Sequence, residues 1–222
     1  MISTEVIPLK LEAIAPIQYY YTAADKGMRT SSFIGDIALK YSLLHQLGEL
    51  TYNEPDKFKP DYGELNRYKF WFTVGVSERA LGIGTSSSVY MKNMLRNTMQ
   101  GIDYNGTNFD PSFKTGALMY KNFFFVQMLR PGNIFYTTIF SEGRIELPRV
   151  LRVGNNKTGI LKIEKDQTGF QRKCVINLYT VSNIMKRKLP EMDYEYREQM
   201  ILQYALVGYL KPEEVAKIYG IA

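Results

Sequence analysis

Lysine and arginine side chains gather in one part of this 222-residue chain, between residues 144 and 188. This basic block carries a net charge of +8, whereas the whole chain carries +6. Its centre is a glycine-bounded loop between two strand-like runs, with the candidate phosphate-binding residues Arg149, Arg152, Gly154, Asn155 and Lys157. Backbone N–H groups in such a loop, with cations beside them, suit a polyanion. The pattern favours binding to nucleic acid, and the alternative is that the basic surface only keeps the protein soluble.

A second group of basic residues lies upstream. Residues 77–118 are rich in Gly, Ser and Asn and have weak periodicity, which is typical of a functional insertion in a compact domain. The candidate contacts of this insertion are Arg79, Lys92, Arg96 and Lys114, and Arg29 precedes them in a polar connector. Residues 82–88 resemble a phosphate loop but lack its Gly-Lys-Ser/Thr ending, so an NTP site is not expected.

Catalytic and metal-binding chemistry is sparse. The single histidine, His45, lies on a predicted helix with Tyr41 and Lys40, and these three could form a metal-independent ribonuclease site. A structural histidine is the favoured interpretation. No Cys/His metal spacing and no dinucleotide fingerprint are present, so we expect no metal, no cofactor, no catalytic residue and no small-molecule substrate.

The location of the protein is also suggested by the sequence. The single cysteine, Cys174, excludes a disulfide framework within one chain and fits a reducing cytosol. We see no signal peptide and no apolar stretch that approaches about 20 residues, so we expect a cytoplasmic protein without a membrane contact.

The hydrophobic pattern predicts an α+β fold. Strands are expected at 5–14, 68–76, 120–129, 133–140, 150–153, 160–164 and 172–181, with Pro131-Gly132 as a hairpin turn. A helix capped by Ser31 or Ser32 is expected to end at Gly48, with an apolar face of Phe33, Ile34, Ile37, Ala38, Tyr41, Leu44 and Leu47. Further helices are expected at 193–209 and 212–219.

This order of elements indicates a helix packed on one face of an antiparallel sheet, as in the ferredoxin-like or RNA-recognition arrangement. We expect one domain over residues 1–190, with the insertion at about 77–118 as a thumb. Residues 191–222 are expected to form a helical acidic tail, because they hold six Asp and Glu against three Lys and Arg.

Four segments, in order, resemble the type I-D member of the CRISPR Cas five family. They are similar to an aromatic-Ala-Thr element with a basic linker and a Tyr-containing helix, a Phe-Asn-x-x-Gly-Glu-Arg element, an Ile-Pro-Gln-aromatic-Gly element and a Pro-x-x-Ile-Arg-Leu-Gly-Lys element. In this chain they are Tyr21–Thr30 leading into Ile34–Leu43, Phe72–Arg79, Asn97–Gly101 and Pro148–Asn155. Two departures are visible. Val76 and Ser77 separate Gly75 from Glu78, and Asn155 stands where the pattern has Lys, a charge that Lys157 could supply.

The resemblance implies a modified RNA-recognition fold with an inserted thumb, in a non-catalytic subunit of a Cascade-type complex for antiviral defence. It implies binding to the 5′ handle of the crRNA. It also implies contacts with the repeated backbone subunit and the large subunit, near the target DNA duplex. Two alternatives stay open: a structural assembly subunit that contacts proteins through its Tyr- and Phe-rich surface, and a metal-independent endoribonuclease that processes crRNA.

Overall fold

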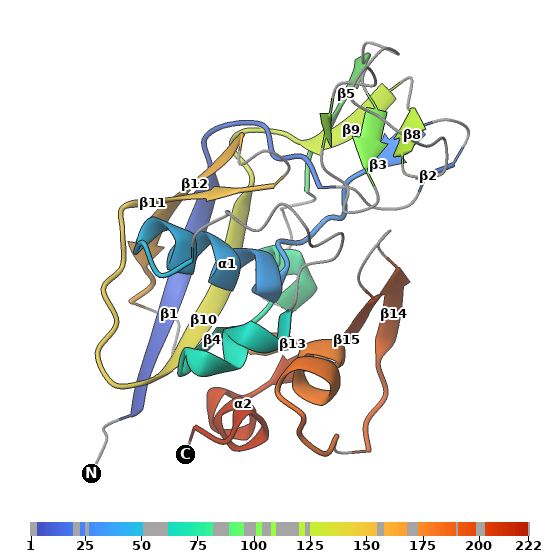
Figure 1. Cartoon of the computed structure of the whole chain (residues 1–222). Coiled ribbons are helices and arrows are strands. Elements are labelled where there is room, and N and C mark those ends of the chain that lie inside the picture. Colours follow the sequence, from blue (N-terminus) through green and yellow to red (C-terminus); the bar gives the residue numbers. More distant parts are fainter. Residues whose placement is uncertain are drawn as a thin grey trace.

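The computed structural model places two helices and several small sheets around one larger sheet (Figure 1). It describes residues 4–19, 23–24, 27–50, 62–81, 89–95, 101–103, 108–109, 120–122, 125–154, 158–167, 173–189, 191–198 and 203–221. The first strands are β1 (Thr4–Ala13), β2 (Ala23–Ala24), β3 (Gly27–Arg29), β4 (Phe70–Phe72), β5 (Met91–Leu95), β6 (Gly101–Asp103), β7 (Asn108–Phe109) and β8 (Tyr120–Asn122). The later strands are β9 (Phe125–Leu129), β10 (Ile134–Glu142), β11 (Val150–Val153), β12 (Gly159–Lys165), β13 (Cys174–Asn177), β14 (Glu195–Glu198) and β15 (Gln203–Leu210). The helices are α1 (Asp36–Gln46) and α2 (Pro212–Tyr219), with short helical turns η1 (Tyr62–Arg67), η2 (Glu78–Leu81) and η7 (Thr180–Ile184).

The central sheet has the strand order β11-β12-β1-β10-β4, and all of its pairs are antiparallel. The four strands β12-β1-β10-β4, numbered by their position along the chain, have the order 4-1-3-2 across the sheet. This is the strand order of a βαββαβ unit, and α1 lies between its first two strands, β1 and β4. The predicted α+β fold with an antiparallel sheet is confirmed. The strands predicted at 5–14, 150–153 and 160–164 are confirmed as β1, β11 and β12.

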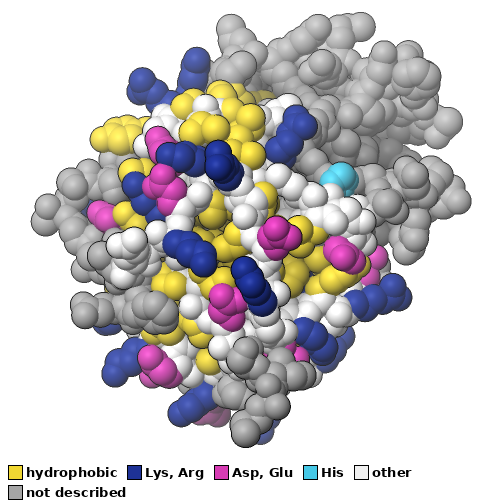
Figure 2. Space-filling model, turned by 90° about the vertical axis from the view of Figure 1, so that its left-hand side faces the viewer, with side chains coloured by type: hydrophobic (Ala, Val, Ile, Leu, Met, Phe, Trp, Pro, Cys, Tyr) yellow, Lys and Arg dark blue, Asp and Glu magenta, His cyan; other side chains and the backbone are white. Residues whose placement is uncertain are grey.

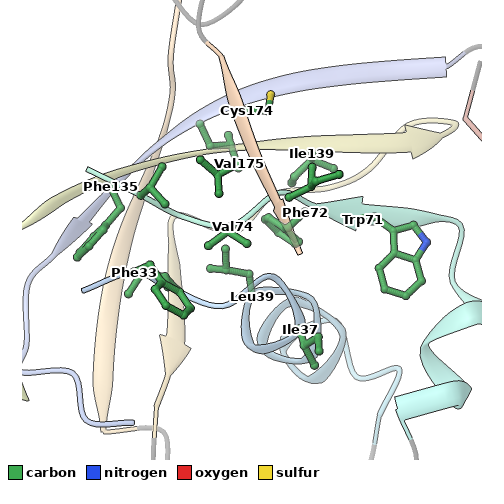
Figure 3. Packing of buried hydrophobic residues seen from close by; sticks show 14 of the residues in the cluster. Phe33, Ile37, Leu39, Trp71, Phe72, Val74, Phe135, Ile139, Cys174 and Val175 are labelled. Atoms are coloured by element: carbon green, nitrogen blue, oxygen red, sulfur yellow. The ribbon is translucent and has the colours of Figure 1, made fainter. Parts of the chain in front are cut away.

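The core lies where α1 meets this sheet. Leu9 and Leu11 of β1 alternate toward α1 and are buried with Leu39 and Leu43 of the helix. Figure 3 shows Leu39 of α1 close to Phe72, Val74 and Ile139 from the strand side. Burial of this many apolar side chains is the main stabilising term of the fold.

Helix α1 begins later than the sequence predicted. Neither Ser31 nor Ser32 caps it, because the N-cap is Gly35 and no side chain bonds the free N–H groups there. A Cβ atom at position 35 would lie 2.1 Å from the hydroxyl of Tyr204, so this close approach requires glycine. The predicted end at Gly48 is confirmed, with Gly48 in the left-handed conformation at φ +75°.

The buried face of α1 also differs from the predicted apolar face. Ile37 and Leu44 are buried as expected, whereas Tyr41 is half-buried and Leu47 is exposed. Two charged residues, Asp36 and Lys40, take buried places on the helix instead.

The predicted hairpin across Pro131-Gly132 is wrong. A turn is present, with Gly132 at φ +88°, but the strands on its two sides belong to different sheets. Strand β9 joins the four-stranded sheet β2-β3-β9-β5, while β10 joins the central sheet. Within the predicted thumb, β6 pairs with β7, whereas β5 pairs with β9 and β6 also pairs with β8, both of which lie outside it.

The C-terminal part contains strands where a helix was predicted. Residues 195–198 and 203–210 form β14 and β15, which build the three-stranded sheet β13-β15-β14. Helix α2 is confirmed with Pro212 at its start, and the side chain of its Tyr219 donates a hydrogen bond to the carbonyl of Phe72 at 3.3 Å. The domain boundary at residue 190 stays a prediction. No described helix is long and apolar enough to cross a membrane.

Candidate nucleic-acid interface

Arg149 and Arg152 lie at an edge of the central sheet. Among the described residues, β11 pairs with β12 alone, so its other side is the outer edge. The carbonyl of Arg149 accepts a hydrogen bond from the N–H of Ile163 at 2.9 Å, and the hydroxyl of Ser42 donates to the carbonyl of Arg152 at 2.6 Å. Both arginine side chains are exposed. The fold thus fixes the backbone of Arg149 and of the edge strand that follows it, while the guanidinium groups of Arg149 and Arg152 reach solvent.

Gly154 ends this strand in a conformation that glycine adopts readily, with φ +78°. A Cβ atom at Gly154 would lie 2.7 Å from the carbonyl oxygen of Gln18. A Cβ atom at Gly159 would lie 2.9 Å from the side chain of Ile17. Both glycines are therefore required by close packing against residues 17–18, a role that the sequence did not indicate. Asn155 and Lys157 lie outside the described residues.

The remaining candidate residues lie away from β11. Arg79 is exposed on η2, shortly after Val76, which bridges Tyr136 of β10. About four strand spacings, or roughly 19 Å, separate that segment from β11. Arg79 is thus part of a different surface, while Arg96 and Lys114 lie outside the described residues.

Arg29 and Lys92 are brought to the same small sheet, on the two sides of β9. Arg29 pairs with Gln127 and Lys92 with Met128, and both basic side chains are exposed. Paired residues share a face of a sheet, and neighbours along a strand point to opposite faces. Arg29 and Lys92 therefore project from opposite faces of this sheet.

Acidic side chains interrupt the basic block. Glu164 of β12 lies 2.7 Å from the amine of Lys162 and 3.7 Å from that of Lys10. The hydrogen bond and charge of Lys162 lower the pKa of Glu164, and Glu164 raises the pKa of Lys162. Figure 2 shows Lys and Arg mixed with Asp and Glu over the described part of this face. The two contacts of Glu164 thus offset positive charge on β1 and β12, while Arg152 of β11 and Arg149 just before it are exposed.

A buried polar cluster holds α1 to the rest of the core, and the sequence did not reveal it. The carboxylate of Asp36 accepts hydrogen bonds from Thr180 at 2.5 Å and from the amide of Asn177 at 3.3 Å. Asp36 is 1% exposed, and burial raises its pKa to about 6. Asn177 also accepts hydrogen bonds from the N–H groups of Tyr179 and Ala205. This cluster joins α1, η7 and β15.

Lys40 is fully buried one helical turn further on. Its amine donates to the carbonyl of Tyr68 at 2.8 Å and lies 3.2 Å from the centre of the Trp71 ring. Burial is the largest cause that lowers the pKa of Lys40 to about 6, and the charge of Lys69 adds to it. A periodicity argument assigns charged residues to the surface, so it missed both Asp36 and Lys40.

Two of the three residues of the alternative ribonuclease site have partners outside that site. Lys40 is enclosed against Trp71, and the hydroxyl of Tyr41 donates to Glu64 at 2.5 Å. His45 is half-buried near the end of α1. Among the described residues, no three or more His, Cys, Asp and Glu side chains are arranged to hold a metal ion.

Comparison with known proteins identifies the family. A cryo-EM structure of the type III-B Cmr-beta complex bound to cognate target RNA and AMPPnP contains a chain with 8% identity and a TM-score of 0.37. The match covers 92% of this chain and 84% of the other, and so distant a likeness does not bear on the assignment. No curated protein sequence matches the chain. The family model of the type I-D CRISPR-associated protein Cas5/Csc1 matches residues 4–207, most of the chain. The chain therefore belongs to the type I-D CRISPR-associated Cas5/Csc1 family.

Proposed function

We propose that this chain is a non-catalytic, RNA-binding subunit of a type I-D effector complex, in which it caps the 5′ handle of the crRNA. The observation that carries the proposal is the sheet edge formed by β11 and the residue before it, where Arg152 and Arg149 are exposed on an anchored backbone. Cations on a fixed backbone suit phosphate groups, which position an RNA strand without reading its sequence. Membership of the Cas5/Csc1 family supports this assignment.

The proposal has further parts that follow from the family. The chain contacts the repeated backbone subunit and the large subunit, and it lies near the target DNA duplex. It acts in the cytoplasm without a cofactor. The engagement of Lys40 with Tyr68 and of Tyr41 with Glu64 gives no support to a ribonuclease site built from these two residues and His45.

The test is co-purification of the full chain with its partner proteins, followed by sequencing of the bound RNA and mapping of RNA–protein crosslinks. We expect short RNAs with one constant 5′ end, crosslinked near residues 149–157. Absence of RNA, or RNA without a common end, would contradict handle binding. If the isolated chain cleaves this RNA and the His45→Ala variant does not, the chain is instead an endoribonuclease that uses His45.

A further inference from the structure

Strand β14 (Glu195–Glu198) is the outer strand of its sheet. Within the described part of the chain it pairs with β15 on one side, and the pairing runs through four consecutive residues without a bulge. An edge strand has backbone N–H and C=O groups that can pair with a further strand. Residues 191–198 contain no proline, so each backbone N–H of β14 is retained, and the charges of the strand set which partner it accepts.

Two exposed tyrosines mark the outer face of this edge. The side chains of Tyr194 and Tyr196 are 58% and 51% exposed. Tyr196 lies within β14, and Tyr194 immediately precedes the strand. Tyr196 pairs with Ala205, the neighbour of the buried Tyr204 on β15, and therefore lies on the face away from Tyr204. Tyrosine is enriched at protein–protein interfaces, where its ring is buried against the partner.

The edge is held firmly by its inner neighbours. On β15, the ring of Tyr204 packs on that of Phe33 with 5.0 Å between the ring centres, and it lies against Gly35. The N–H of Ala205 donates to the side chain of Asn177, which itself bonds Asp36. A strand that is already ordered loses little conformational entropy when a partner docks.

We propose that β14 receives an extended, Lys- or Arg-rich segment of a different protein chain, which adds to the sheet as a further strand. Residues 191–198 carry a net charge of −3 in a chain of +6, and Glu191 and Asp193 are exposed. This charge attracts a basic segment and repels RNA. It also opposes pairing with β14 of a second copy, which would bring −3 against −3. Main-chain hydrogen bonds provide affinity in this mode of recognition, and side chains provide specificity.

The site lies far from the proposed RNA edge. Figure 1 shows β14 and β11 on opposite sides of the molecule. The inference depends on the contacts of β14 and β15 and is independent of whether the chain binds a crRNA handle.

Hydrogen–deuterium exchange tests the proposal on the full chain, alone and in the complex that it forms with its partner proteins. We expect the backbone amides of residues 194–198 to exchange at least tenfold more slowly in the complex. Crosslinking of carboxylates to amines should join Glu191 or Asp193 to lysines of another protein. In the complex, the Tyr196→Lys variant should lose this protection, because it adds a positive charge at the docking edge, whereas Leu47→Lys at the exposed end of α1 should keep it.

Three results would overturn the inference. The first is equal exchange of residues 194–198 in the free chain and in the complex. The second is an RNA crosslink at Tyr194 or Tyr196, and the third is a crosslink of this edge to a second copy of the same chain. Sequencing of RNA from the same preparation reports handle binding separately, so failure of one proposal is distinguishable from failure of the other.

Discussion

Lys40 and Asp36 are two charged residues in the core, and their protonation links stability to pH. In the folded state the pKa of Lys40 is lowered from 10.5 to about 6, so the unfolded chain binds more protons between these pH values. Stability contributed by Lys40 therefore rises with pH above about 6. The pKa of Asp36 is raised from 3.8 to about 6, so its contribution falls as the pH rises toward 6. The two effects together predict a minimum of stability near pH 6.

The Lys40→Met variant should remove the rise above this minimum. We expect the free energy of unfolding of the unchanged protein to increase between pH 6 and 9, on the order of 1 kcal/mol per pH unit while Lys40 differs by one proton between the two states. The variant should be nearly flat over this range. Urea unfolding at several pH values measures both, with Lys217→Met on the exposed face of α2 as the control. Parallel pH profiles for Lys40→Met and the unchanged protein would show that Lys40 does not cause the rise.

At the scale of elements, comparing Gly154 with Gly48 distinguishes two ways in which an added side chain destabilises the fold, backbone strain and overpacking. Both have a positive φ, +78° and +75°, so alanine at either position pays the strain of the left-handed conformation, about 1–2 kcal/mol. Gly48 has nothing within 4 Å of an added Cβ, whereas Gly154 lies against the carbonyl of Gln18. Chemical unfolding should therefore show Gly154→Ala to be less stable than Gly48→Ala by a further 1–3 kcal/mol or so, the usual cost of overpacking. Equal losses of stability would mean that residues 17–18 move aside freely.

The elements also show where sequence reasoning succeeded. The hydrophobic patterns of residues 9–14 and 150–153 predicted two strands of the central sheet, because each pattern is local. Residues 193–209 were assigned to a helix, since Glu, Arg, Gln, Met and Leu favour helices locally. Residues 203–210 form a strand instead because they pair with β13, which lies about 30 residues earlier in the sequence. The turn at Pro131-Gly132 was found, but a turn signal does not say which sheet each flanking strand joins.

Part of the candidate site was also predicted from the sequence. Arg149 and Arg152 were identified from charge and type, and the structure places both on one exposed edge. The separation of Arg79, Arg29 and Lys92 onto other surfaces depends on strand order, which residue types do not encode. Asp36 and Lys40 were missed because only the fold supplies the partners that make a buried charge tolerable.

At the scale of the whole molecule, the positive and acidic edges lie on opposite sides, and the salt dependence of RNA binding tests the positive one. Each phosphate contact with a single strand contributes about 0.7 to the slope of log affinity against log salt concentration. Arg149→Ala and Arg152→Ala should each weaken binding and reduce this slope by roughly that amount, for handle RNA and for a scrambled RNA of equal length alike. Lys217→Ala removes one charge from α2 and should leave the slope unchanged, because a distant charge displaces no counterion from the RNA. A slope reduced equally by all three variants would show that net charge, and not the edge strand β11, determines the affinity.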